Sequence, residues 1–410
     1  MWMTFLDQLL RQAVRQGTLI VHPPTGSPSR YGDGTGQPVT VRINDPSLPR
    51  RIMLNPDLGI GEGYMDGTFT IDGDDLHGFL RLAILNSANA WKHPLHRMLW
   101  KLRYLARVTR QYNPARRARA RVAHHYDLSG ELYDLFLDAD KQYSCAYFHS
   151  ETDTLEQAQA QKKAHIAKKL LIEPGMNVLD IGCGWGGLGL TLARDHGARV
   201  LGVTLSEEQH RVANERARAA GLSDRARFQL MDYREVEGRF DRVVSVGMFE
   251  HVGSPHYRAY FRTVHDKLLP DGIALIHTIG RTLPPGANSP WIEKYIFPGG
   301  YIPALSEMMA AAEKADLMSQ DIEVWRMHYA LTLRHWHDRF MSNIDRVRDL
   351  YDDRFCRMWR YYLAACEQTF RHNRQVVFQV QLARKVDAVP ITRDYLYAAP
   401  RMQQRDMAAE

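Results

Sequence analysis

A glycine-rich turn that follows an apolar strand constrains the fold of this 410-residue chain more than any other feature. Residues 178–181 predict the end of a buried strand, and residues 188–194 predict a helix. Between them lie three glycines with the G-x-G-x-x-G spacing that lets a backbone approach a bound cofactor: Gly182, Gly184 and Gly187. By itself, this turn is only a weak indication of a nucleotide-like cofactor.

The end of the next predicted strand, residues 199–206, distinguishes between cofactors. A dinucleotide site expects an acidic residue about 20 residues past the glycines to hold the ribose hydroxyls. This strand instead ends in Thr204 and Ser206, and Gln209 in the next helix is left as a neutral partner for a ribose. Asp180, just before the glycines, is placed to attract a cationic cofactor such as S-adenosylmethionine, which carries an ammonium and a sulfonium.

Predicted helices and strands alternate from about residue 155 to residue 278, which implies a doubly wound, mostly parallel sheet. Ligands of such sheets bind outside the carboxyl ends of the strands, and Asp180, Glu250 and His277 fall on that rim. Asp232 ends an intervening strand and is the expected partner of an adenine amine. Residues 375–382 alternate like a closing strand, which we expect to be antiparallel.

The rest of the chain predicts two further regions. Residues 1–90 predict a small α+β domain, with an apolar helical stripe in residues 1–16 and then short strands and turns. Residues 123–410, which contain the alternating region and the glycine-rich turn, predict a second and larger domain, the catalytic domain. Within it we expect residues 284–303 to form a long loop and the helices beyond residue 305 to form a lid.

Positive charge is concentrated between Asp75 and Asp127, where no carboxylate and eleven lysines and arginines occur, although the whole chain carries only +6. Apolar residues interleave with these charges at helical spacing, so residues 91–122 predict a basic amphipathic linker. A solvated linker, a surface for anionic lipid and a nucleic-acid patch all remain open. We favour an anionic membrane and expect no nucleic acid, because no nucleic-acid module accompanies the charges.

The four cysteines show no metal-ligand spacing, which predicts a cytoplasmic protein without a bound metal. The sequence contains no run of about 18 apolar residues that could span a bilayer. We therefore expect any membrane association to be peripheral, at the inner face.

Five motifs in a fixed order resemble those of the cyclopropane fatty acid synthases: residues 142–148, 178–187, 202–206, 247–253 and 277–280. Residues 125–128 also match, and residues 1–90 resemble the lipid-binding extension of the longer bacterial members. The resemblance implies a Rossmann-like class I S-adenosylmethionine-dependent methyltransferase. Such an enzyme methylates the cis double bond of an unsaturated phospholipid acyl chain and closes a cyclopropane ring. A homodimer is a further expectation from the family.

The resemblance also implies the site residues. The family uses a bound bicarbonate ion as base, and the matching catalytic positions are Cys145, Glu250, His277, the backbone of Ile279 and Tyr329. The position of Tyr329 rests on the match over residues 328–336. The expected cofactor contacts are Tyr143, Ser144, Asp180, Gly182, Gly184, Gly187, Thr204, Ser206, Gln209, Asp232 and Tyr233. An alkene is a weak nucleophile, so the site must align it and exclude water, and residues 284–303 are a candidate wall of an acyl-chain tunnel.

Alternatives remain at this point. Cys145 could be a small buried residue and His277 a core histidine, but their motifs favour a site. A relative that leaves a methylene or methyl branch without ring closure would have almost the same site. A lipid-binding protein without catalysis is disfavoured by the intact Cys145, Glu250 and His277, and a nicotinamide oxidoreductase by Thr204.

Overall fold

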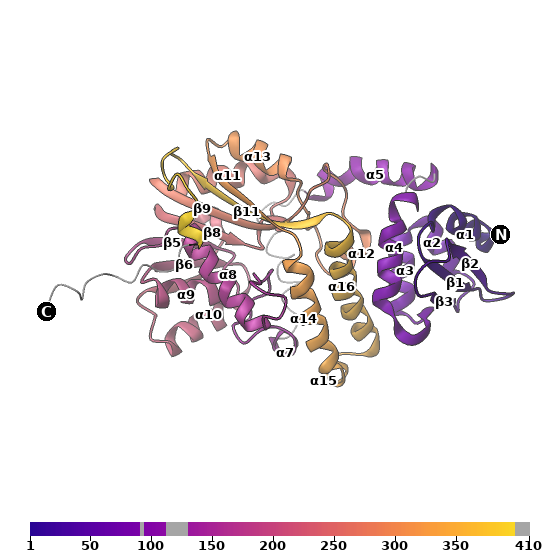
Figure 1. Ribbon diagram of the computed structural model, residues 1–410. Helices are drawn as coiled ribbons and strands as arrows, with labels where there is room; N and C mark the ends of the chain where they lie inside the picture. The colour runs from indigo at the N-terminus through magenta and orange to yellow at the C-terminus, as the bar shows by residue number, and fades with distance from the viewer. Residues whose placement is uncertain (91–93, 112–129, 398–410) are drawn as a thin grey trace.

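The computed structural model describes residues 1–90, 94–111 and 130–397. Two sheets lie at opposite ends of the molecule, with a layer of long helices between them (Figure 1). The larger sheet has seven strands in the order β10-β11-β9-β8-β5-β6-β7. Their bounds are β5 Asn177–Ile181, β6 Arg199–Thr204, β7 Ala226–Leu230, β8 Phe240–Val246, β9 Leu268–Arg281, β10 Met318–Trp325 and β11 Gln375–Ala383.

The pairing of the strands confirms the predicted doubly wound sheet. Strands β7, β6, β5, β8 and β9 are parallel, and β11 lies antiparallel between β9 and β10, as predicted. Strand β10 was missed because it is a half-exposed edge strand in which polar and apolar residues do not alternate regularly. It nevertheless contributes Trp325, which is almost fully buried beside the site.

Helices cover both faces of this sheet: α8 Leu155–Lys169, α9 Gly187–Asp195, α10 Glu207–Ala219, α11 Tyr257–Lys267 and α13 Leu305–Glu313. Successive strand residues point to opposite faces, so Val178 packs in one hydrophobic core with Ile166 of α8, and Leu179 in the other with Phe261 of α11. Helix α8 begins with a capping box in which Thr154 and Gln157 satisfy each other's backbone amides. The sheet is therefore buried on both sides and gives the site a rigid base.

The amino-terminal part contains a four-stranded sheet in the order β2-β1-β3-β4. Its elements are α1 Trp2–Ala13, β1 Thr18–His22, β2 Ser29–Gly32, β3 Val39–Ile43, α2 Leu48–Leu54, α3 Pro56–Met65, β4 Phe69–Ile71 and α4 Leu76–Ala90. The expectation of only short strands and turns was wrong for residues 48–65, which form two helices. The glycines of α3 hid the helical pattern. They are needed for close packing, since a Cβ on Gly59 would lie 2.6 Å from the backbone nitrogen of Ile52.

The remaining helices are α5 Pro94–Gln111, α7 Gly130–Asp134, α12 Pro290–Tyr295, α14 His328–Ser342, α15 Ile344–Leu350, α16 Asp353–His372 and α17 Asp394–Tyr397. Helices α14 and α16 stand between the two sheets, and α5 runs along one edge of the molecule (Figure 1). The predicted loop 284–303 contains the short helix α12, which is capped by Ser289. None of the helices within the described residues has the length and apolar character needed to cross a bilayer.

Segment 284–303 joins the two ends of the molecule. Trp291 is buried against α3, and its indole Nε1 donates to Met65 Sδ at 3.3 Å. Glu62 of α3 accepts from Lys294 Nζ at 2.7 Å and from the Tyr295 hydroxyl at 2.9 Å, and its second oxygen accepts from Arg51. Trp291 and Tyr295 therefore belong to the contact with the amino-terminal part. They do not line the cleft described below.

The Glu62 cluster should contribute to stability in a pH-dependent way. Burial alone would raise the pKa of Glu62, but hydrogen bonds from Lys294, Arg51 and Tyr295 lower it to about 2, from 4.5. The folded state therefore binds fewer protons than the unfolded state between these values, and stability is lost as the pH falls through this window. We predict that Glu62→Gln lowers the free energy of unfolding by about 1–2 kcal/mol at neutral pH.

Urea unfolding at several pH values measures this difference. It should shrink below pH 4.5, where the native glutamate loses its advantage. Glu208→Gln, at a surface pair with Arg211, serves as the control and should change stability by less than about 1 kcal/mol. A loss for Glu62→Gln that is independent of pH would contradict the assignment.

Candidate active site

A cleft opens at the carboxyl ends of β5, β6 and β8, where doubly wound sheets bind ligands. Gly182 and Gly184 line it with positive φ angles of 80° and 55°. A Cβ on Gly182 would lie 2.9 Å from the Cβ of Met248, so only glycine fits this turn. The predicted residues among those that line the cleft are Tyr143, Ser144, Asp180, Gly182, Gly184, Thr204, Gln209, Asp232 and Tyr233.

Asp180 is buried at the base of the cleft, and its Oδ2 has no hydrogen-bond partner among the described residues. Burial raises the pKa of this carboxyl to about 7, and the charge of Lys162 opposes the shift. A buried carboxylate oxygen with no partner is well suited to a cationic ligand group, because such a group would satisfy both its charge and its hydrogen bond. The site thus fits the ammonium of S-adenosylmethionine.

The far end of the cleft contains the expected ribose and adenine contacts. Thr204 Oγ1 donates to Gln209 Oε1 at 2.8 Å, which leaves the amide nitrogen of Gln209 as a donor for a ligand. Asp232 lies beyond β7 and pairs through both oxygens with Arg234, at 2.7 Å from Oδ1 to Nε and 2.5 Å from Oδ2 to Nη2. An adenine amine would therefore share Asp232 with Arg234, which the sequence did not indicate.

Two predicted cofactor residues are not among the described residues that line the cleft, and their contacts stay predictions. Gly187 begins α9, and a Cβ there would collide with the side chains of Asp140 and Gln142. Ser206 caps α10, where its hydroxyl accepts from the Gln209 amide at 3.3 Å. Both positions are explained by local structure, since one allows close packing and the other starts a helix.

Glu250 and Ile279, which are 29 residues apart, meet directly. The Ile279 amide donates to Glu250 Oε1 at 2.6 Å, while Glu250 Oε2 is buried without a partner in the described part of the chain. Burial raises the pKa of Glu250 to about 7, and hydrogen bonds from the Ile279 amide, the Glu250 amide and the Thr278 side chain oppose the shift. Near neutral pH the side chain can therefore accept or donate a proton.

His277 lies two residues before Ile279 and so on the same face of β9. Its Nδ1 is 3.1 Å from Gln379 Nε2, which as donor would place the ring proton on Nε2. Burial is the main cause that lowers its pKa well below the usual value, so the imidazole is neutral. The predicted end of this strand, residue 278, falls short of the observed one. Pairing with β11 extends β9 to Arg281, and His277 is level with Val246 at the end of β8.

The other two predicted catalytic residues, Cys145 and Tyr329, lie on two further segments that are tied to each other. Cys145 is fully buried, which raises the pKa of its thiol and keeps it a neutral donor. The next amide, of Ala146, donates to Thr332 Oγ1 on α14 at 3.0 Å and so ties this loop to the helix that carries Tyr329. The Tyr329 ring packs at 4.8 Å from that of Phe370.

The donor set fits a small oxyanion better than a metal. By prediction this set comprises the thiol of Cys145, the imidazole of His277, the hydroxyl of Tyr329 and the unpartnered oxygen of Glu250, and the contact seen directly is the one between Glu250 and the Ile279 amide. Within the described residues no group of three His, Cys, Asp or Glu side chains could hold a metal ion. The adjacent His124 and His125, which could not easily converge on one metal ion, lie outside the described residues. The residues present therefore fit a bicarbonate ion, whose contacts remain a prediction.

Lys162 was missed by the sequence interpretation although it lines the cleft. It lies on α8 and is about 1% exposed. The available signal was its position in the buried stripe of that helix, where a lysine takes the place of an apolar residue next to Leu155, Ala158 and Ile166. A charged residue on a buried stripe marks a group with a specific partner.

The strand order, the antiparallel β11 and the glycine turn beside Asp180 define a Rossmann-like class I S-adenosylmethionine-dependent methyltransferase. The chain belongs to the mycolic acid cyclopropane synthetase family, whose sequence profile matches residues 113–380. Residues 5–93 match a separate domain family of unknown function.

Relatives cover most of this chain. It is 38% identical over 354 residues to the cyclopropane-fatty-acyl-phospholipid synthase of Escherichia coli K12. The matching region covers 85% of this chain and 89% of that protein. It is 35% identical over 384 residues to the tuberculostearic acid methyltransferase UfaA1 of Mycobacterium tuberculosis, 87% of each chain. The mycolic acid cyclopropane synthase CmaA1, solved in complex with SAH and CTAB, superposes with a TM-score of 0.61 at 30% identity, covering 66% of this chain and 99% of that one.

The buried Glu250 should make the free energy of unfolding depend on pH in the opposite direction to Glu62. Its pKa rises from 4.5 to about 7 on folding, so the folded state binds more protons and loses stability as the pH rises through this window. Glu250→Gln removes the ionisation and keeps an oxygen for the Ile279 amide. We predict that the variant is more stable than the wild type at pH 8, by about 2–3 kcal/mol, and that the difference shrinks toward pH 5.

Thermal and urea unfolding between these pH values measure the effect. The exposed Glu237→Gln should show no such trend. A Glu250→Gln variant that is less stable than the wild type at pH 8 would contradict the raised pKa.

Proposed function

We propose that this enzyme transfers a methyl group from S-adenosylmethionine to the cis double bond of an unsaturated phospholipid acyl chain and closes a cyclopropane ring. The observation that carries the proposal is the arrangement of two buried carboxyl groups, each with an unpartnered oxygen. Asp180 lies in the cofactor cleft and Glu250 beside Ile279. The similarity to the Escherichia coli synthase supports the phospholipid substrate.

The residues of the chain have distinct roles in this proposal. S-adenosylmethionine supplies an electrophilic methyl group, and bicarbonate a base, when they are bound. Asp180 would hold the cofactor ammonium, and the Gln209 amide and Asp232 its nucleoside. Glu250, Cys145 and His277 would hold the bicarbonate and keep the proton that leaves the acyl chain away from water. Their burial serves the same end, because water would otherwise trap a carbocation.

The segment that follows α12 supports an acyl-chain path. Phe297 packs with its ring centroid 6.0 Å from that of His251 and also 6.0 Å from that of Tyr362. Pro298 and Gly299 line the cleft itself. This stretch would bring an apolar chain to the cofactor, whereas Trp291 and Tyr295 of the same segment anchor it to α3.

A second candidate product is a methyl or methylene branch without ring closure. It is favoured by the 35% identity to UfaA1, which is named as a tuberculostearic acid methyltransferase. The two outcomes share the methyl transfer, which leaves a cation on the neighbouring carbon. Ring closure follows when the added methyl group loses a proton directly, whereas a methylene branch needs a 1,2-hydride shift to the cation before the same methyl group loses its proton. A saturated methyl branch needs a hydride donor as well, so control of the hydride shift separates the ring from the branch.

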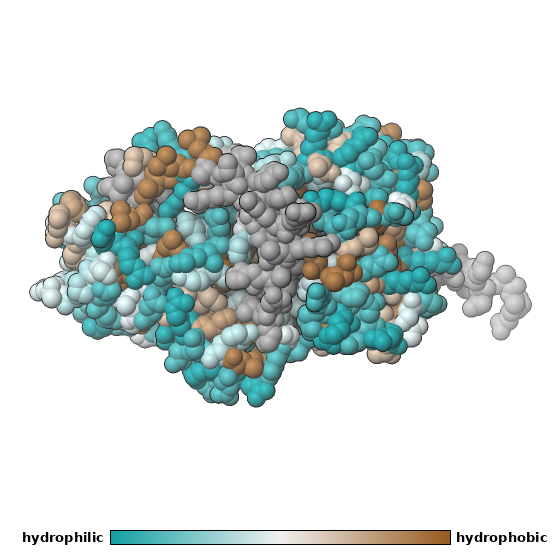
Figure 2. Space-filling model, turned by 180° about the vertical axis from the view of Figure 1, so that it is seen from behind, coloured by the Kyte–Doolittle hydropathy of each residue, from teal (hydrophilic) through white to brown (hydrophobic). Residues whose placement is uncertain are grey.

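We further propose that α5 binds an anionic membrane and that the enzyme works at the cytoplasmic face. On α5 the exposed side chains Met98, Leu102 and Leu105 recur at helical spacing, with exposures of 53%, 57% and 74%. Arg97, Lys101 and Arg103 accompany them, and α5 contains no acidic residue. Helix α5 lies at the upper right of Figure 1. The half-turn brings this part of the molecule to the upper left of Figure 2, where apolar residues gather. All four cysteines are free, which suits the reducing cytoplasm.

The activity is tested by incubating the purified protein with S-adenosylmethionine and vesicles of a cis-monounsaturated phospholipid. We expect mass spectrometry to show acyl chains that gain one CH2, and proton NMR to show upfield cyclopropane signals. Vinylidene or methyl-branch signals would support the second candidate. An unchanged mass, in protein that binds the cofactor, would contradict both.

The membrane proposal predicts a loss of vesicle binding when Arg97, Lys101 and Arg103 are all changed to glutamine. Each basic residue near an anionic surface contributes about 1 kcal/mol, so affinity should fall by about a hundredfold and depend less on salt. Vesicle sedimentation measures it. A matched triple change of Arg194, Arg211 and Arg348, which are exposed on α9, α10 and α15, should have a small effect. Equal losses for the two triple variants would exclude α5 as the membrane contact.

A further inference from the structure

We propose that Lys162 is the positioning residue for the amino-acid end of the cofactor, since its ammonium holds Ser144 and Gln142 on one side of the cleft and faces Asp180 on the other. This inference rests on the proposed cofactor site. It adds a residue that neither the sequence motifs nor the similarity to relatives assigned. The hydrogen-bond partners of Lys162 are the predicted cofactor residue Ser144 and its neighbour Gln142, so we expect Lys162 to act by positioning them.

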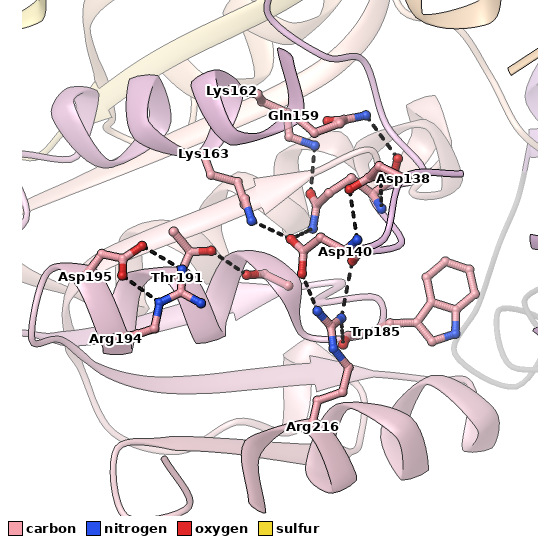
Figure 3. Close-up of polar contacts among 12 residues, drawn as sticks. Asp138, Asp140, Gln159, Lys162, Lys163, Trp185, Thr191, Arg194, Asp195 and Arg216 are labelled. Atoms are coloured by element: carbon pink, nitrogen blue, oxygen red, sulfur yellow. Dashed lines mark hydrogen bonds and ion pairs between the residues drawn. The ribbon is translucent and has the colours of Figure 1, made fainter. Parts of the chain in front are cut away.

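The contacts of Lys162 are strong and buried. Its Nζ donates to Gln142 Oε1 at 2.7 Å and to Ser144 Oγ at 2.8 Å. Gln159, one turn earlier on α8, donates to the backbone carbonyls of Gln142 at 3.2 Å and Ser144 at 3.0 Å. Figure 3 shows how these side chains reach from α8 to the loop. Loop 142–145, which carries Tyr143, Ser144 and Cys145, is thus fixed by one face of one helix.

A second set of charges holds the preceding part of the loop. Lys163 Nζ contacts Asp140 Oδ2 at 2.5 Å, and Arg216 of α10 pairs with Asp140 Oδ1 (Figure 3). Asp138 accepts from the Gln142 amide at 2.9 Å. Asp140 Oδ2 also accepts from Gln142 Nε2 at 3.1 Å, so the two sets meet at Gln142, but neither Lys163 nor Asp140 is among the described residues that line the cleft. Lys163 therefore provides a neighbouring control with the same charge and a different partner.

Lys162 also sets the electrostatics of the cleft. Lys162 and Asp180 both line it, and Lys162 is the charge that favours the ionised form of Asp180 against burial. The titratable groups that interact with Lys162 are Asp138, Asp140, Cys145 and Lys163, and the charge of Lys162 helps burial to lower the pKa of His277. Burial is the main cause that lowers the pKa of Lys162, to about 8. Cys183 is the other titratable neighbour of Asp180, and burial raises its pKa, so it stays a neutral thiol.

The two pKa values define a window for cofactor binding. Asp180 is a carboxylate above about pH 7, and Lys162 is an ammonium below about pH 8. Removing the lysine charge raises the pKa of Asp180 further, so less of it is ionised at neutral pH. Replacing lysine with arginine keeps the charge at every pH of interest, because a guanidinium does not deprotonate there.

The test is calorimetric titration of the full-length protein with S-adenosylhomocysteine from about pH 6.5 to about pH 8.5. The variants are Lys162→Met, Lys162→Arg and Lys163→Met. Each affinity is divided by that of the wild type at the same pH, so that titration of the ligand cancels. This measurement requires no lipid substrate, so its outcome is independent of the product chemistry.

We expect Lys162→Met to bind about tenfold more weakly than the wild type near pH 7, with a ratio that recovers toward pH 8.5 as Asp180 ionises and the native lysine loses its proton. The affinity of Lys162→Arg relative to the wild type should rise at alkaline pH, because the arginine keeps its charge when the native lysine loses its own. Lys163→Met should show a ratio that does not vary with pH.

Three outcomes would overturn the proposal. The first is an unchanged affinity of Lys162→Met, and the second a loss with the same flat pH dependence as Lys163→Met. The third is a Lys162→Arg variant whose affinity falls with rising pH in the same way as that of the wild type, because this would show that deprotonation of Lys162 does not cause the fall. This third comparison remains available if Lys162→Met does not fold. Failure of the wild type to bind S-adenosylhomocysteine would instead reject the cofactor site on which this proposal rests.

Discussion

The hydrogen bond from the Ile279 amide to Glu250 is the contact on which the candidate site depends. It joins the end of β9 to the short 3-10 helix after β8, and it leaves the second carboxylate oxygen of Glu250 buried. A protein rarely leaves such an oxygen without a partner, because the lost hydration is not recovered. The arrangement is understandable if a ligand completes it.

The same reasoning extends to the other buried polar groups of the candidate site. Asp180, Glu250, Lys162 and His277 are all almost fully buried, and burial works against the charged form of each. Burying these groups costs free energy of folding. The large hydrophobic cores offset that cost, namely the cores on both faces of the sheet and the cluster of Trp, Tyr and Phe side chains around α14 and α16. Such a site keeps its groups near neutrality and dry, which suits the methylation of an alkene.

The sequence predicted those parts of the fold and the site in which the local backbone conformation requires a particular residue type. The glycines after β5 were predictable because only glycine adopts the turn, and Asp180 because of its place before that turn. The catalytic roles of Cys145, Glu250, His277 and Tyr329 came from the resemblance alone and stay predictions. What local patterns could not give were contacts between distant segments. Examples are the bond between Glu250 and Ile279, the pairing that extends β9 past His277, and Lys162 beneath the loop of Ser144. Each depends on how elements pack, and no spacing along the chain encodes it.

The most direct test of the account is a crystal structure of the enzyme with S-adenosylhomocysteine and bicarbonate. The account predicts the amino-acid end of the ligand against Asp180, with the loop of Ser144 in its present place, and a planar anion in contact with Glu250 Oε2. A ligand bound away from Asp180, or a Glu250 oxygen satisfied by a neighbouring side chain with no anion present, would contradict it.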